Sequence, residues 1–123
     1  SRSLGALTLS VEGPRRVYAS PNDQSIVLLV EGPQRSMLLS GDIETFAQAE
    51  LGHLRADVLK VPHQGAATSD PEWLAGIGAE TAVISVGPNQ FGHPVNWVVD
   101  VLVSSGAKVL RTDEAGDVAV SLS

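Results

Sequence analysis

The chain has 123 residues, of which 43% are hydrophobic and 18% are charged. This is the length and composition of one globular domain rather than of a disordered segment. The net charge of −6 argues against a surface that grips nucleic acid by itself, and the lack of cysteine excludes disulfides and thiolate metal sites. The longest apolar runs, such as SIVLLV, are far shorter than the roughly 20 residues of a membrane-spanning helix.

The first forty residues predict strands joined by turns. Apolar and polar residues alternate from Ala6 to Glu12, which is typical of a strand. The sequence RRVYAS is compatible with a short second strand, and the turn formers from Ser20 to Ser25 predict a loop. The apolar run SIVLLVE then predicts a strand whose hairpin partner, after Gly32 and Pro33, is RSMLLS.

The pattern changes to a helical period at Ile43. Ile43, Phe46, Ala47 and Leu51 share one helical face and predict a buried helix that ends at Gly52. Glu44 and Glu50 are expected to point outward from this helix. The stretch ADVLKV then predicts a buried strand.

Strands and helices continue to alternate to the end of the chain. Ser69 and Glu72 form a capping-box pattern that predicts a helix in SDPEWLAGIG. The run TAVISVG predicts a strand, and PVNWVVDVLVSSG predicts a helix with Trp97, Val98, Val101 and Leu102 as its buried stripe. A strand in AKVLRT, a turn in DEAGD and a last strand in VAVSLS complete the prediction.

This order of elements predicts an α/β fold with a mixed β-sheet and helices on at least one face. We find no internal repeat, linker or low-complexity stretch. Residues 1–123 are therefore expected to form a single domain or one half of a larger domain.

Three polar residues follow predicted strands and are candidates for a functional site. Asp42 precedes a helix, so it is either a helix N-cap or a metal-bridging carboxylate. His63 lies between Pro62 and Gln64-Gly65, and His93 lies between Gly92 and Pro94. Each is either an ordinary loop histidine or a residue of a functional site. Carboxyl ends of parallel strands meet at one edge, so the three would converge as oxygen and nitrogen ligands. His53, after a helix end, is expected at the surface.

Several motifs together resemble a known family. The stretches SPNDQSIVLLVE, MLLSGDIE, LRADVLKVPHQGAATSD, AVISVGPNQFGHP and VLRTDEAGDV follow one another as in the metallo-β-lactamase-like C-terminal domain of the ComEC family, the DNA-internalisation proteins of bacterial competence. The resemblance covers residues 20–120 and implies the second half of an αββα sandwich, with metals at the edge between the halves. It identifies Asp42 as a metal-bridging ligand, His63 as a second ligand, and His93 as a catalytic residue that bonds a phosphate or leaving group.

The resemblance further implies a metal-dependent nuclease that uses two zinc or manganese ions, with a bridging hydroxide attacking a phosphodiester. It also implies DNA as a partner of the whole protein, although not one bound strongly by this acidic fragment, and an extracytoplasmic position in a bacterial inner-membrane protein. The other partners expected are the remaining half of the domain and, because half a sandwich exposes an apolar face, a second copy or a rearranged strand. As an isolated fragment the chain is expected to be inactive.

The sequence departs from the family pattern at two points. Gln64 and Ala66 replace the second histidine and the serine of Pro-His-His-Gly-Ser, and the His-x-(His/Asp)-x-Asp-His motif of the first half is absent from these residues. Two alternatives therefore stay open: a degenerate, non-catalytic interaction module, and a metallo-hydrolase that acts on a small substrate.

Overall fold

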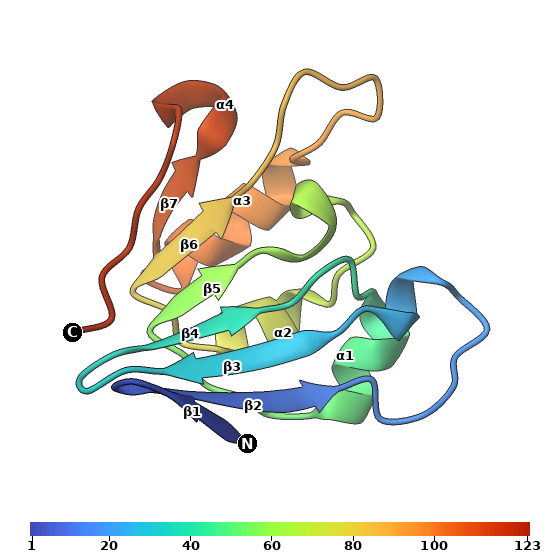
Figure 1. Ribbon diagram of the computed structural model, residues 1–123. Coiled ribbons are helices and arrows are strands. Elements are labelled where there is room, and N and C mark those ends of the chain that lie inside the picture. The colour runs from blue at the N-terminus through green and yellow to red at the C-terminus, as the bar shows by residue number, and fades with distance from the viewer.

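The computed structural model describes residues 1–123 as one seven-stranded sheet with helices packed against one face (Figure 1). The strands lie side by side in chain order. The first four strands pair antiparallel, and the fourth strand also begins a parallel half that runs to the seventh. This confirms the predicted α/β fold with a mixed sheet. The strands are β1 (Arg2–Leu4), β2 (Leu7–Gly13), β3 (Val27–Glu31), β4 (Ser36–Leu39), β5 (Val58–Lys60), β6 (Thr81–Ile84) and β7 (Lys108–Arg111).

The parallel half follows from strand–helix alternation, since each parallel crossover returns through a helix or loop on the same face. None of the helices is long and apolar enough to cross a membrane. The helices are α1 (Thr45–Leu51), α2 (Pro71–Gly76), α3 (Asn96–Ser104) and the short α4 (Thr112–Ala115), with 3-10 turns η1 (Asn22–Gln24) and η2 (Pro62–Gly65).

The core lies between the sheet and α1, α2 and α3. Leu38, Leu59 and Ala82 occupy paired positions on β4, β5 and β6, so their side chains share the helix-covered face. All three are completely buried and belong to one cluster of 19 residues. The helices contribute to the same cluster through Ala47, Leu51, Trp73, Leu74, Val98 and Leu102.

The opposite face of the sheet carries no helix, because α1, α2 and α3 all lie on the other side (Figure 1). Leu28, Leu39, Lys60, Val83 and Leu110 form one row across it, since each is paired with the next in the strand register. This face is therefore largely apolar, as expected for half of a sandwich. Dimerisation through it stays a prediction.

Two predicted strands do not form. The stretch RRVYAS is a loop in which Val17 is 86% exposed and Arg16 lies over the Tyr18 ring, 4.5 Å from its centroid. The final VAVSLS also lacks strand structure, and its Leu122 carbonyl instead accepts a hydrogen bond from Arg35 N in the β3–β4 turn. Alternation of apolar residues predicted strands here, but neither segment pairs with a neighbouring strand.

Two details of the helices also differ from the sequence prediction. Phe46 is 63% exposed, while Gln48 takes a buried place in α1 and donates to Ile43 O and Ser69 Oγ. Ser69 is thereby used in the core, and Asp70 caps α2 by accepting from Glu72 N. The predicted stripe of α3 is confirmed: Val98 and Leu102 are buried, and Trp97 and Val101 pack against the core.

Candidate functional site at the carboxyl edge of the sheet

The four parallel strands β4 to β7 end at one edge of the sheet. The turns that follow β4, β5 and β6 carry Asp42, His63 and His93, respectively. Ligand sites in α/β sheets gather at this edge, because loops there diverge while the strand ends stay fixed. The three turns therefore lie at this one edge, and their contacts show which of the residues meet.

Asp42 lies in the turn between β4 and α1. Its backbone N–H donates to Ser25 Oγ at 3.1 Å, but its exposed carboxylate makes no hydrogen bond or ion pair. The N-cap position of α1 is held by Glu44, whose side chain makes no capping hydrogen bond, so the N-cap interpretation of Asp42 is wrong. The preceding Gly41 has a φ of +55°, and a Cβ there would lie 2.7 Å from Ser25 Cβ. The turn therefore needs glycine at position 41.

His63 occupies a constrained turn directly after β5. His63 and Gln64 both adopt left-handed backbone, with φ of 53° and 57°, which costs a non-glycine residue about 1–2 kcal/mol each. The His63 N–H donates to Gly41 O at 3.0 Å, which ties this turn to the one after β4. Such strained pairs persist only where their surroundings hold them, and they are common at functional sites.

The His63 ring faces a carboxylate that the sequence did not single out. His63 Nδ1 lies 3.5 Å from Glu44 Oε2 and 3.5 Å from Thr68 Oγ1. Both the histidine and Glu44 are about one quarter exposed. A carboxylate at Nδ1 orients the ring and leaves Nε2 for another partner. The prediction that Glu44 points outward is therefore wrong, because Glu44 precedes the first helical turn instead of lying on its outer face.

Glu44 is itself held by a buried acid. Its backbone N–H donates to Asp23 Oδ1 at 2.8 Å, and Asp23 is only 5% exposed. Ser20 Oγ also donates to Glu44 Oε1, at 3.4 Å. The loop from Ser20 to Ser25 therefore supports the His63–Glu44 pair from across the sheet edge. Its run of turn formers predicted a loop but gave no sign of this contact.

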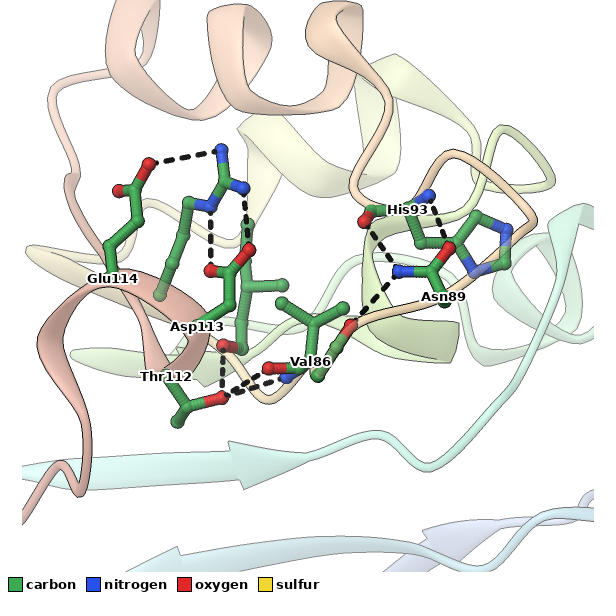
Figure 2. Close-up of polar contacts among 9 residues, drawn as sticks. Val86, Asn89, His93, Thr112, Asp113 and Glu114 are labelled. Carbon is green, nitrogen blue, oxygen red and sulfur yellow. Dashed lines mark hydrogen bonds and ion pairs between the residues drawn. The ribbon is translucent and has the colours of Figure 1, made fainter.

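His93 lies in the loop between β6 and α3, which the Asn89 side chain organises (Figure 2). Asn89 Nδ2 donates to Gly87 O and His93 O, while Asn89 Oδ1 accepts from Phe91 N and His93 N. All four distances are 2.9–3.1 Å. One amide side chain therefore fixes both backbone groups of His93.

The two histidine turns meet at their rings and at their backbones. The ring centroids of His63 and His93 are 5.5 Å apart, in an edge-to-face arrangement at 70°. Val95 N donates to Gly65 O at 3.0 Å, and a Cβ on Gly65 would lie 2.6 Å from Pro94 Cβ. Gly65 is therefore required for this close approach, and the edge brings His63, His93 and Glu44 together.

The end of β7 completes the same edge without a histidine. Thr112 Oγ1 bonds the backbone N–H and C=O of Val86, which locks β7 to the start of the His93 loop (Figure 2). Arg111 pairs with Asp113 at 2.7 Å and with Glu114 at 3.5 Å. Its hydrogen bonds lower the pKa of Asp113, and the same hydrogen bonds raise the pKa of Arg111.

A metal centre needs at least three ligands in reach of one point. The chain contains no group of three histidine, aspartate or glutamate side chains that could hold a metal ion. The residues of this chain alone therefore do not fit a complete metal centre, although nitrogen and oxygen donors lie at its carboxyl edge. His53 is exposed after α1, as predicted, and lies apart from these residues in the Gly76 region.

These features define a mixed α/β domain with a histidine-bearing carboxyl edge. Three curated proteins are similar to it over most of its length: ComE operon protein 3 of Bacillus subtilis (36% identical, 89% of this chain), competence protein ComA of Neisseria gonorrhoeae (34%, 77%) and recombination protein 2 of Haemophilus influenzae (35%, 85%). The chain is thus homologous to part of these ComEC-family proteins. No protein-family model matches it.

The chain spans only 14–15% of the length of these relatives. Their names are those of a ComE operon protein, a competence protein and a recombination protein, and none names a metal, a nuclease or a metallo-β-lactamase-like domain. The similarity therefore supports the ComEC resemblance and leaves the chemistry of the carboxyl edge to be argued from the residues.

Proposed function

We propose that residues 1–123 form the second half of a metallo-β-lactamase-like hydrolase domain that cleaves DNA in a DNA-uptake protein. The observation that carries this proposal is the meeting of His63, His93 and Glu44 at the carboxyl edge. Competence relatives support a role in DNA uptake. The resemblance in the SGD, PHQG and GHP motifs supports the hydrolase chemistry, and an extracytoplasmic position in the parent protein belongs to the same proposal.

Each residue has a proposed role that matches its place. His63 is a metal ligand through Nε2, because Glu44 lies at its Nδ1. Asp42 is a second ligand, because its carboxylate has no other partner in the chain. His93 donates a hydrogen bond to a phosphate oxygen or leaving group, and Asn89 fixes its backbone for that task. Since the chain assembles no three-ligand group, the remaining ligands come from outside these residues.

The open apolar face has a role in the same proposal. In an αββα sandwich two sheets pack face to face, so Leu28, Leu39, Val83 and Leu110 would be covered by the other half. In the isolated chain no helix covers this face, so we expect the chain to be inactive and to associate with itself.

The test compares two chains in the same assay. The 123-residue chain and a chain extended toward the N-terminus by the first half are each incubated with DNA and Mn²⁺ or Zn²⁺, with and without a chelator. We expect metal-dependent cleavage by the extended chain and none by the 123 residues alone. If the extended chain carries the His-rich motif but binds no metal by calorimetry and cuts no DNA, the proposal fails.

A second candidate is a degenerate module without catalysis. Gln64 favours it, since this exposed residue adopts a left-handed backbone at the place of the family's second histidine. Restoring the motif with the double substitution Q64H/A66S distinguishes the two. A degenerate domain gains activity only after restoration, whereas an intact hydrolase is active before it.

A further inference from the structure

We propose that Phe91 is a stacking platform for an unpaired base, which makes single-stranded nucleic acid the substrate class of the carboxyl-edge site. This inference rests on the proposed hydrolase function. It adds a binding residue that neither the SGD, PHQG and GHP motifs nor the metal chemistry requires.

The placement of Phe91 carries the inference. Its side chain is 79% exposed, and its ring stacks on His93 with centroids 5.7 Å apart and an interplanar angle of 27°. His93 in turn meets His63 edge to face at 5.5 Å. The three rings form a continuous row that ends, at Phe91, in an open aromatic surface. A base that stacks there extends the row and places its nucleotide at the His93 end of the site.

The platform is built before any ligand arrives. Asn89 Oδ1 accepts from Phe91 N at 3.0 Å and from His93 N at 3.0 Å, so one side-chain atom fixes the backbone of both rings. Gly92 between them has a φ of +77°, a conformation that glycine adopts readily and that allows the reversal that places the rings together. An aromatic group held rigidly binds with less loss of conformational entropy than a mobile one.

Phe46 shows what an exposed phenylalanine without this role looks like. It is 63% exposed on α1, but Arg16 lies over its ring, 5.4 Å from the centroid, and it contacts neither histidine. Isolated exposed apolar residues need no explanation. Phe91 differs because its ring continues the site, and this makes Phe46 a matched control.

Charge and base pairing select the ligand. The chain has a net charge of −6, so attraction to phosphates does not drive binding. Stacking on an aromatic ring needs no positive charge and accepts any base, and truncation to alanine weakens binding by about fivefold to about a hundredfold per base in known single-strand binders. A paired base is already stacked within its duplex, so the open ring selects an unpaired one.

The test is an NMR titration of the 123-residue chain with a short oligothymidylate. We expect shifts concentrated at Phe91, Gly92 and His93. Phe91→Ala should weaken binding by about fivefold to about a hundredfold, Phe91→Trp should retain it, and Phe46→Ala should leave it within about twofold. The same oligonucleotide annealed to its complement should bind less tightly, and raising the salt concentration should not weaken binding, because it screens the repulsion between two negatively charged partners.

Three outcomes would overturn the inference: no shifts in the His93 loop at saturating oligonucleotide, equal affinity of Phe91→Ala and the native chain, or equal affinity for duplex. A dispersed spectrum of Phe91→Ala establishes that this variant is folded. Failure of the proposed hydrolase function is distinguishable, because the extended chain would then cleave no DNA while Phe91-dependent binding persisted.

Discussion

The two histidine turns at the carboxyl edge are held in different ways. The turn of His63 is fixed by the main chain: a left-handed backbone, a hydrogen bond from His63 N to Gly41 O, and Gly65 packed against Pro94. The loop of His93 is exposed and depends on the side chain of Asn89. The position of His63 is therefore coupled to the stability of the fold, whereas the position of His93 depends on one amide.

Because the two turns are held differently, substitutions in them should affect different properties, namely the stability of the fold and the geometry of the site. Changes near His63 should act first on the free energy of unfolding, because neighbouring turns share their backbone contacts there. Changes near His93 should move the ring and leave the fold in place, because the loop contributes little to the core. Substitutions at matched positions of the two turns test this contrast.

The largest effect is expected from Gly65→Ala. Its Cβ would lie 2.6 Å from Pro94 Cβ at a φ of +77°, so clash and backbone strain should add to about 2–5 kcal/mol of destabilisation. Gly92→Ala is the control, because Gly92 has the same φ and no atom within 4 Å of the new Cβ. It should cost only about 1–2 kcal/mol. Equal midpoints in urea unfolding of the two variants would contradict the contrast.

Asn89→Ala should change the site more than the fold. The substitution removes four hydrogen bonds in an exposed loop and should lower the free energy of unfolding by about 1 kcal/mol. The nuclear Overhauser contacts between the Phe91 and His93 rings should disappear, while the His63 N–H stays protected by Gly41 O.

Asn22→Ala serves as the control for this variant, because the Asn22 side chain makes no hydrogen bond in the structure and lies in the η1 turn. A ring contact that survives in Asn89→Ala would mean that the loop backbone, and not the amide, positions His93.

Gln64→Gly should stabilise the protein slightly. Glycine relieves the left-handed backbone at this position but loses more entropy on folding, which leaves a gain of about 0.5–1 kcal/mol. Gln64→Ala keeps the strain and should give no gain. Thermal unfolding of both variants measures the difference, and a destabilised Gln64→Gly would show that the Gln64 side chain supports the His63 turn.

The smallest effect is expected at the β7 end, which carries no histidine. Arg111 lowers the pKa of Asp113 in the folded state, so the stability that this pair contributes is present above the unfolded pKa and is lost as pH falls through the folded one. The stability difference between Asp113→Asn and the native chain should therefore shrink on acidification below about pH 4. A stability difference between the two chains that grows toward low pH would contradict a lowered pKa of Asp113 in the folded state.

The sequence was sufficient to predict that His63 and His93 lie at the carboxyl edge of the sheet. Asp42, His63 and His93 each follow an apolar strand and precede a helix, and parallel strands bring such positions together. Glu44 could not be found this way, because the helical period placed it on the outer face of α1, whereas it is the residue directly before the helix begins. Asn89 is equally hidden, since a loop asparagine has no periodic pattern.

The wrong predictions for VAVSLS and Phe46 both come from relying on the apolar pattern alone. Periodicity reports which side chains are apolar, but a strand also needs a partner with free backbone groups. The segment VAVSLS alternates as a strand should, and the outer edge of β7 is free, yet the segment does not pair there and instead runs to Arg35. Phe46 fits the apolar stripe of α1, but Gln48 is buried in that helix through its bonds to Ile43 O and Ser69 Oγ.

The most direct test of the proposed site is metal-dependent DNA hydrolysis by the extended chain with single histidines replaced. His63→Ala should lower the rate at least about a hundredfold, because it removes a proposed ligand. His53→Ala, at an exposed histidine remote from the edge, should leave the rate unchanged. Full activity of His63→Ala, in a variant shown to be folded, would contradict the assignment of this edge as the hydrolase site.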